Sequence, residues 1–254
     1  MKKKIAIYFL LTFCFVLPGC SESGAKQEEI ITEQADFRIG VEADQAPYYS
    51  VDENGNASGI YVDLMDEISK KGGYTYEFTE IDPSVFQAGT KKNSCDVFLG
   101  TMENDTGDMT ELFQTTSFYQ SGVCLVTRTE DNIKKVKNLR NIVIAAGTSG
   151  GEAAFAQYLA VKYEADALLF VDGITAFEDF INGNSRTAVL DANVCQAKME
   201  ENMPIRLWKT SEKYYNFHRF TAKGHTEFLD TLENQISEIM SDGTMDTLLQ
   251  KNGL

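Results

Sequence analysis

The chain has 254 residues, with 23 Lys and Arg against 38 Asp and Glu, a formal net charge of -15 and a hydrophobic content of 43%. This is the composition of a globular protein, and it excludes a disordered chain, a collagen or a coiled coil. The acidic balance argues against a nucleic-acid partner, because binding to phosphates requires a basic face.

The N-terminal residues indicate a segment for export. Lysines at 2–4 precede an apolar run at 5–16, which is shorter than the about 20 residues that a transmembrane helix needs. A basic start, a short apolar core and small residues before a cleavage point are typical of a secretory signal. The sequence LPGC at 17–20 resembles a bacterial lipobox, which implies cleavage after Gly19 and a lipid on the Cys20 thiol. A plain signal with an incidental cysteine is the alternative.

The segment after the signal is expected to act as a tether. We assign residues 1–19 to a signal peptide and 20–35 to a flexible tether, and we expect the ordered chain to begin near Phe37. The sequence contains no other long apolar run. We therefore predict a protein that lies outside the cytoplasm and is anchored to the cell membrane through the lipid on Cys20.

The cysteine and histidine content argues against a metal site. Cys95, Cys124 and Cys195 allow one disulfide at most, and whether they pair stays open. The sequence contains no Cys-x-x-Cys motif and only two histidines, so a zinc site is not expected. We expect no metal and no cofactor.

Apolar periodicity predicts alternating strands and helices. Strands are predicted at 37–41, 74–78, 96–100, 122–127, 142–146, 168–171 and 187–190, and helices at 60–71, 152–163, 174–181, 227–240 and 244–250. Such alternation favours an α/β fold with mostly parallel sheets, and two successive series of this kind favour two lobes. In open parallel sheets ligands bind beyond the carboxyl ends of strands, which directs attention to the loops after Val41, Leu99, Ala146 and Leu190.

Four segments resemble the family 3 extracytoplasmic solute-binding proteins, the amino-acid receptors of ABC importers. They are RIGVE at 38–42 with PY at 47–48 and GIYVDL at 59–64, CDVFLG at 95–100 with FYQSG at 118–122, IAAGTSG at 144–150, and AVLD at 188–191 with SDGTM at 241–245. Their order and spacing cover most of the chain after residue 37.

The resemblance implies an α/β fold of the two-lobed periplasmic-binding-protein type II architecture. Mixed, mostly parallel sheets flanked by helices would form each lobe, and two extended strands would join the lobes at a hinge. Lobe 1 would contain 36–126 and 216–254, and lobe 2 would contain 127–215. The protein would be a monomer without catalytic activity that captures a small polar, amino-containing ligand, an amino acid or a basic amine, and delivers it to an ABC permease.

The resemblance also assigns roles to single residues. Asp191 matches the position that binds the ligand ammonium group, and Glu42 matches a second acidic position. Thr148 and Ser149 precede a helix, whose free N–H groups favour a carboxylate. Thr101 matches a further hydrogen-bonding position. The complete set of predicted ligand-binding residues is Glu42, Gln45, Tyr48, Thr101, Glu103, Asp108, Thr148, Ser149 and Asp191.

Three positions depart from the family pattern. Asp108 stands where the family has the arginine that binds the ligand carboxylate, Glu103 replaces a small or hydroxyl residue, and Gln45 replaces an aromatic residue that stacks on the ligand. Carboxylates that share a cleft without a cation repel one another, and a cationic ligand would relieve this repulsion. We therefore favour a basic ligand held by Glu42, Glu103, Asp108 and Asp191. The alternative is that Glu103 and Asp108 point to solvent, or that Arg128 replaces the missing arginine.

Three other functions remain open from the sequence. The same lobes can present a ligand to a membrane receptor kinase instead of a permease. Residues 147–151 match the G-x-S-x-G pattern of a hydrolase, with Ser149 as nucleophile and Asp191 with His218 or His225 as partners. Paired carboxylates such as Glu42 and Asp191 could also support dehydratase chemistry.

Overall fold

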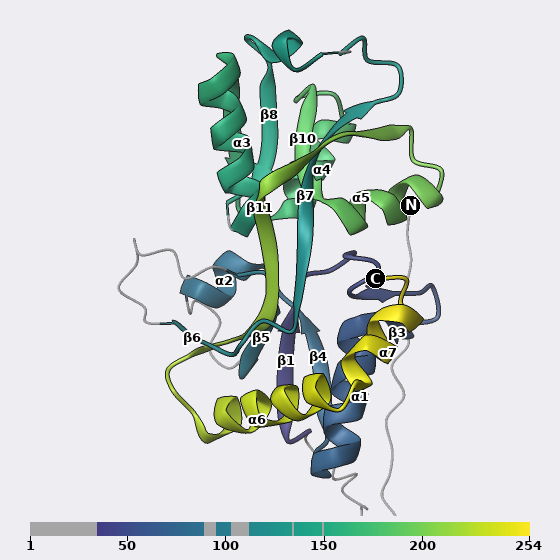
Figure 1. Cartoon of the computed structure of the whole chain (residues 1–254), viewed down its shortest axis with the longest axis vertical. Helices are drawn as coiled ribbons and strands as arrows, with labels where there is room; N and C mark the ends of the chain where they lie inside the picture. Colours follow the sequence, from purple (N-terminus) through teal and green to yellow (C-terminus); the bar gives the residue numbers. More distant parts are fainter. Residues whose placement is uncertain (1–34, 89–94, 103–111, 134, 149) are drawn as a thin grey trace, which may run out of the picture. The chain divides into compact units, whose positions relative to one another are not determined.

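The computed structural model describes residues 35–88, 95–102, 112–133, 135–148 and 150–254. Its main sheet has the strand order β4-β1-β5-β11-β7-β10-β8-β9, with β6 paired to β11, and the short strands β2 (Ser50–Val51) and β3 (Ala57–Ser58) form a separate hairpin. Helices pack against both groups of parallel strands (Figure 1), so the α/β fold expected from the sequence is confirmed.

The first lobe is built around three parallel strands. Strand β1 (Phe37–Val41) pairs with β4 (Tyr76–Glu80) on one side and β5 (Val97–Gly100) on the other. The remaining elements of this lobe are β6 (Leu112–Gln114), α1 (Ile60–Gly72), α2 (Pro83–Ala88), α6 (Glu227–Ser241) and α7 (Thr244–Lys251). One core joins the inner faces of β1, α1 and α6.

The second lobe repeats this construction. Strand β8 (Val143–Gly147) lies parallel to β9 (Asp166–Phe170) and β10 (Thr187–Asp191). The helices of this lobe are the 3-10 helix η1 (Val136–Leu139), α3 (Gly150–Tyr163), α4 (Gly173–Ile181) and α5 (Ala192–Glu200). Helix α3 packs against one face of these strands through one apolar cluster. Helices α4 and α5 pack against the opposite face through a second cluster.

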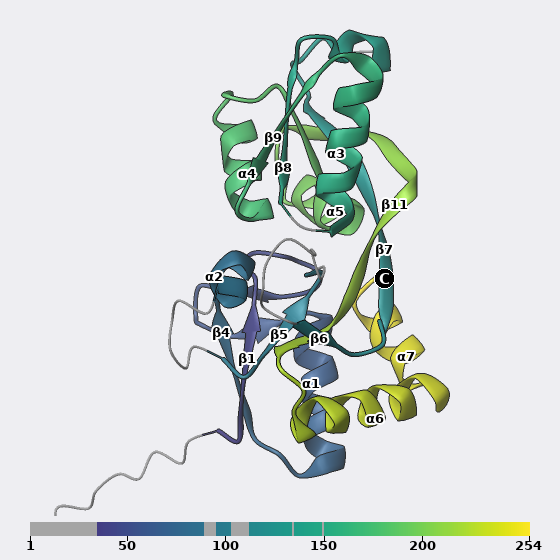
Figure 2. The ribbon, with the colours of Figure 1, turned by 90° about the vertical axis from the view of Figure 1, so that its left-hand side faces the viewer.

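Two long antiparallel strands run through both lobes (Figures 1 and 2). Strand β7 (Tyr119–Arg128) pairs with β11 (Ile205–Lys223) from Arg128 opposite Ile205 to Tyr119 opposite His218, with irregular register near Thr210 and Tyr215. Their arrangement matches the two hinge strands that the resemblance implied. The predicted lobe limits at 126/127 and 215/216 fall inside these strands, so they remain a prediction.

Local sequence signals explain most of the elements. Helix α1 buries Ile60, Leu64, Met65 and Ile68, the apolar positions that predicted it, and ends at Gly73, whose left-handed backbone (φ 72°) lets its N–H donate to the Ser69 carbonyl. Asp172 caps α4 by accepting a hydrogen bond from the Thr175 N–H.

Several elements differ from the prediction. Strand β4 begins two residues later than expected, and β9 begins two residues earlier. Because side chains alternate between the two faces of a sheet, a shift of two residues leaves the pattern of each strand unchanged. Helix α3 includes Gly150 and Gly151, although glycine is unfavourable in helices. Helices α2 and α5 and the long strand β11 were not predicted, because their apolar residues follow no clear period.

The burial of side chains in the core of the first lobe leads to a testable prediction. The side chain of Leu64 is fully buried, so Leu64→Ala should lower the free energy of unfolding by about 2–5 kcal/mol through lost burial and a cavity. Val161 on α3 is 87% exposed, and Val161→Ala should leave the stability almost unchanged. Chemical denaturation measures both, and equal effects of the two variants would contradict this description of the core.

Candidate functional site

The ends of four strands border one cavity. Glu42 follows β1, Thr101 follows β5, Gly147 ends β8 and Asp191 ends β10. All four loops named from the sequence therefore contribute to it. Its lining residues are Glu42, Gln45, Tyr48, Tyr61, Pro83, Leu99, Gly100, Thr101, Gly147, Glu152, Asp172, Gly173, Asp191, Asn216 and His218.

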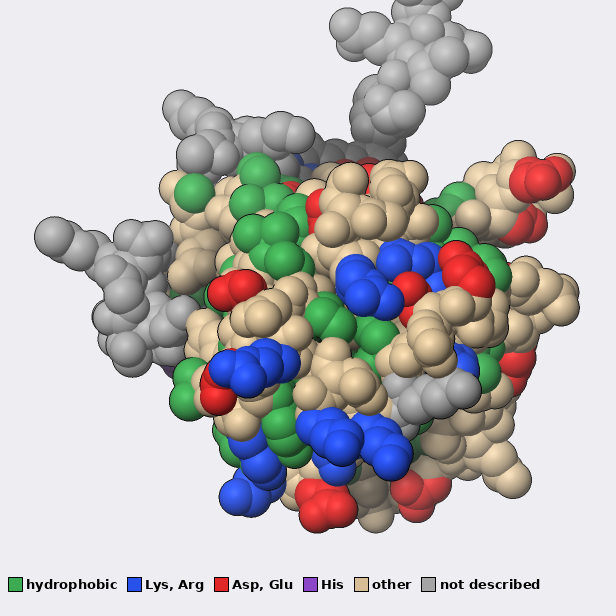
Figure 3. Space-filling model, turned by 90° about the horizontal axis from the view of Figure 1, so that it is seen from above, with side chains coloured by type: hydrophobic (Ala, Val, Ile, Leu, Met, Phe, Trp, Pro, Cys, Tyr) green, Lys and Arg blue, Asp and Glu red, His purple; other side chains and the backbone are tan. Residues whose placement is uncertain are grey.

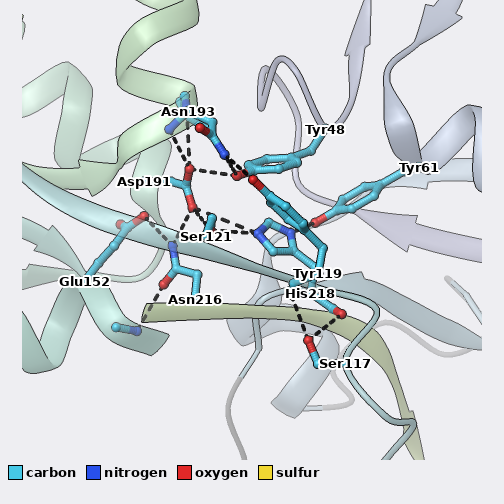
Figure 4. Close-up of polar contacts among 12 residues, drawn as sticks. Tyr48, Tyr61, Ser117, Tyr119, Ser121, Glu152, Asp191, Asn193, Asn216 and His218 are labelled. Atoms are coloured by element: carbon cyan, nitrogen blue, oxygen red, sulfur yellow. Dashed lines mark hydrogen bonds and ion pairs between the residues drawn. The ribbon is translucent and has the colours of Figure 1, made fainter. Parts of the chain in front are cut away.

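Asp191 accepts hydrogen bonds at both carboxylate oxygens (Figure 4). Oδ1 accepts hydrogen bonds from the Tyr48 hydroxyl at 2.8 Å and from the backbone N–H of Asn193 at 2.9 Å. Ser121 Oγ and Asn216 Nδ2, the latter at 2.9 Å, donate to Oδ2. Because Asp191 is also the N-cap of α5, its carboxylate is fixed by backbone and side chains together.

A directional hydrogen-bond chain connects Asp191 with Tyr61. Since the Ser121 hydroxyl hydrogen goes to Asp191, Ser121 Oγ accepts from His218 Nε2 at 2.8 Å, which places the imidazole proton on Nε2. His218 Nδ1 then accepts from the Tyr61 hydroxyl at 2.7 Å. Burial of the ring lowers the pKa of His218 to about 4, despite the attraction of Asp191, so the histidine is neutral near pH 7.

Three further carboxyl groups line the same cavity. Glu42 Oε1 accepts a hydrogen bond from the Gly173 N–H at 3.1 Å, and Glu152 Oε1 lies 3.5 Å from Asn216 Nδ2. Burial and the charge of Asp172 raise the pKa of Glu42 to about 7. Burial, with the charges of Asp191 and Glu42, raises the pKa of Glu152 to about 8. Burial also raises the pKa of Asp172, to which nearby Asp82 contributes.

The cavity contrasts with the molecular surface. None of the described residues that line it is a lysine or arginine. Lysine and arginine side chains are nevertheless exposed beside acidic ones on the face shown in Figure 3. The negative charge of the cavity is therefore a local property of the site and not only a reflection of the net charge of the chain.

Contacts between residues of the two lobes surround the cavity. Tyr48 bonds to Asp191, and Asn193 Nδ2 donates to the hydroxyl groups of Tyr48 and Tyr119 at 2.9 Å each. Lys198 Nζ on α5 lies 2.8 Å from Asp44 Oδ2, which belongs to the loop after β1. These bonds hold the loop after β1 against the start of α5.

The structure places five of the predicted residues at the cavity. They are Glu42, Gln45, Tyr48, Thr101 and Asp191. Thr148 is exposed and donates to the Val171 carbonyl at 3.4 Å, away from the lining. The remaining predicted positions lie outside the described residues, and they are Cys20, Glu103, Asp108 and Ser149.

Arg128 does not line the cavity. Its guanidinium contacts Asp131 Oδ2 at 3.0 Å and the carbonyls of Phe180 and Ser185 at the far part of the second lobe. The alternative in which Arg128 replaces the missing carboxylate-binding arginine is therefore wrong for this arrangement.

Sequence reasoning missed several lining residues. Glu152 occupies the first turn of α3 directly after the glycine-rich loop, and Asp172 caps α4 directly after β9. Both follow carboxyl ends of parallel strands, so the rule applied to the other loops would have found them. His218 and Asn216 come from the middle of β11, for which the sequence contains no local signal.

The described part of the hydrolase triad does not have the required geometry. His218 Nε2 and Asp191 Oδ2 are 4.0 Å apart, and Ser121 bridges them. His225 is exposed and pairs with Asp230 at 3.0 Å. An acid that bonds to a serine, and not to the histidine, does not orient that histidine as a base.

The described residues contain neither a metal-binding cluster nor a membrane-spanning helix. Within those ranges no three His, Cys, Asp or Glu side chains are placed to hold a metal ion. No helix in the described ranges is both long enough and apolar enough to cross a membrane. Cys124 and Cys195 are free thiols, and both are fully buried.

Ionisation of Glu42 and Glu152 should destabilise the ligand-free protein as the pH rises. Their pKa values of about 7 and 8 lie above the usual value of 4.5, so the folded state binds more protons than the unfolded state. The free energy of unfolding should therefore fall by about 1–2 kcal/mol from pH 7 to pH 8.5, a range in which His218 is neutral in the folded state and mostly neutral in the unfolded state.

Chemical denaturation at the two pH values measures this loss. The Glu42→Gln/Glu152→Gln double variant should lose most of the dependence, because neither amide titrates. An unchanged pH dependence in the double variant would show that other groups cause it.

Comparison with known proteins agrees with this architecture. The sequence matches the family described as bacterial extracellular solute-binding proteins, family 3, over residues 37–253. A probable ABC transporter arginine-binding protein of Chlamydia trachomatis is 23% identical, over 100% of this chain and 98% of that protein, and the L-cystine-binding protein of Bacillus subtilis is 22% identical over 99% and 97%. An ancestral arginine-binding protein solved with arginine has a TM-score of 0.69 and 22% identity, over 85% of this chain and 97% of that chain. The chain belongs to the bacterial extracellular solute-binding proteins, family 3.

Proposed function

We propose that this protein captures a small organic cation in the cavity between its lobes and delivers it to an ABC permease. The observation that carries the proposal is the lining of the cavity, which contains Glu42, Glu152, Asp172 and Asp191 and, among the described residues, no lysine or arginine.

Electrostatics supports a cationic ligand over an anionic or neutral one. Crowded carboxyl groups raise one another's pKa, and a cation among them favours the ionised forms through charge-assisted hydrogen bonds. A free amino acid also brings a carboxylate, which the family is expected to bind with an arginine that is Asp108 in this sequence. We therefore favour an amine or guanidine without a carboxylate, with a basic amino acid as second choice.

The same proposal covers the placement of the protein. Residues 1–19 would direct export, Cys20 would carry the lipid, and residues 20–35 would tether a monomeric body to the outer face of the membrane. Lobe 1 would contain 36–126 and 216–254, lobe 2 would contain 127–215, and binding would occur without chemistry on the ligand. Family membership supports the extracytoplasmic site of action.

A ligand panel tests the class of ligand. Agmatine and putrescine should raise the melting temperature most, arginine less, and glutamine and glutamate least, because each added carboxylate meets the acidic lining. A ligand at one hundred times its Kd adds about 2.7 kcal/mol to the free energy of unfolding. A shift with glutamate or glutamine and none with the amines would contradict the proposal.

The anchor makes a separate prediction. In cells that express the chain, Cys20→Ser should move the protein from the membrane fraction to the soluble or secreted fraction, because one acceptor thiol is lost. Cys95→Ser is the matched control and should stay with the membrane. Membrane association of Cys20→Ser that resists washing with salt would contradict lipid attachment at Cys20.

A further inference from the structure

Asp191 has little capacity left for a ligand. Oδ1 already accepts hydrogen bonds from Tyr48, from Asn193 and, at 3.5 Å, from the Val194 N–H, and Oδ2 accepts from Ser121 and Asn216. A carboxylate has about four lone-pair sites, so these donors saturate it. A ligand ammonium group at Asp191 would have to displace buried protein donors and leave them unpaired, which is costly.

Unlike Asp191, the carboxyl groups of Glu42 and Glu152 approach the open space beside Gly173. Glu42 Oε1 and Glu152 Oε2 each lie 3.5 Å from the point that a side-chain Cβ at residue 173 would occupy. The two carboxyl groups come from different lobes, one after β1 and one in the first turn of α3. The absence of a side chain at Gly173 leaves open the space that both oxygens approach, within the cavity already described.

We propose that the cationic group of the ligand, a primary ammonium or a guanidinium, binds between Glu42 and Glu152 at Gly173, and that Asp191 is a positioning residue for the cavity wall. This inference rests on the proposed function, because it assumes that the cavity binds the ligand. A cation shared by two carboxylates from different lobes contacts both lobes at once. Its binding energy therefore stabilises their approach.

The arrangement couples binding to proton release. Near pH 7 the raised pKa values of Glu42 and Glu152 leave both groups partly protonated, and a cation favours their ionised forms. Affinity should therefore increase from pH 6 to pH 8. The other charged or titratable groups that line the same cavity or contribute to these pKa values are Asp82, Asp172, Asp191, Tyr48, Tyr61 and His218. Asp44 and Lys198 line an adjoining pocket together with Glu152 and Gly173, and Glu80 lines another together with Glu42. Of these, His218 is neutral throughout this range.

Two variants test the position of the cation. Glu152→Gln keeps the shape of the side chain but removes its charge, and Gly173→Ala places a methyl group between the two carboxyl groups at ordinary contact distance. Each should weaken agmatine binding to the full-length protein by at least about tenfold at pH 8, the loss expected for one charge-assisted bond. Glu178→Gln, which removes a charge from the exposed side of the same α4 helix, is the matched control and should bind as the wild type does.

Titration calorimetry with agmatine, in buffers of different ionisation enthalpy, adds a second readout. At pH 7 the wild type should release protons on binding, and Glu152→Gln should release fewer. The melting temperature of each ligand-free variant checks its folding, and Gly173→Ala keeps every charge if Glu152→Gln folds poorly.

Three outcomes decide between the possibilities. Loss of affinity in both variants together with reduced proton release supports the inference. Wild-type affinity in both variants, with binding abolished in Asp191→Asn, would overturn it while leaving the proposed function intact. Failure of the wild type to bind agmatine, putrescine or arginine would overturn the proposed function and this inference together.

Discussion

Four carboxyl groups share one cavity with no lysine or arginine among its described lining residues, and this unbalanced charge governs the whole site. Each group is accommodated differently. Asp191 is stabilised by five hydrogen-bond donors and Asp172 by the start of α4. Glu42 and Glu152 are stabilised by partial protonation. Tyr48, Ser121 and Asn216 donate three of the bonds to Asp191, and the same bonds hold these side chains in the cavity wall. The shape of the wall therefore depends on the need to stabilise the buried carboxylate.

His218 is neutral and therefore does not balance the charge of the carboxyl groups. A protonated imidazole would compensate one carboxylate, but burial makes that form too costly, and the ring relays hydrogen bonds from Tyr61 to Ser121 instead. The cavity thus keeps its negative character, and hydrogen bonds hold its wall around Asp191 in place. A wall that is already fixed lowers the cost of binding a ligand with positive charge.

Local patterns in the sequence were sufficient for the alternating strands and helices and for the loops that contain Glu42, Thr101 and Asp191. The acidic cleft was expected from departures from the family pattern. Glu42 and Asp191 line the cavity, and so do Glu152 and Asp172, which were not predicted. Whether a side chain in the first turn of a helix points to solvent or to a cavity depends on contacts with distant strands. Asn216 on β11 bonds to both Glu152 and Asp191, and no local pattern reports such a contact.

The bond between Lys198 and Asp44 makes the contact between the two lobes dependent on ionic strength. It joins an amine on α5 to a carboxylate on the loop after β1, and the acidic partner is largely exposed. Salt at 0.15 M screens exposed charges over about 8 Å, so this contact weakens in concentrated electrolyte. The contact between the loop after β1 and helix α5 therefore depends on the ionic strength of the surrounding solution.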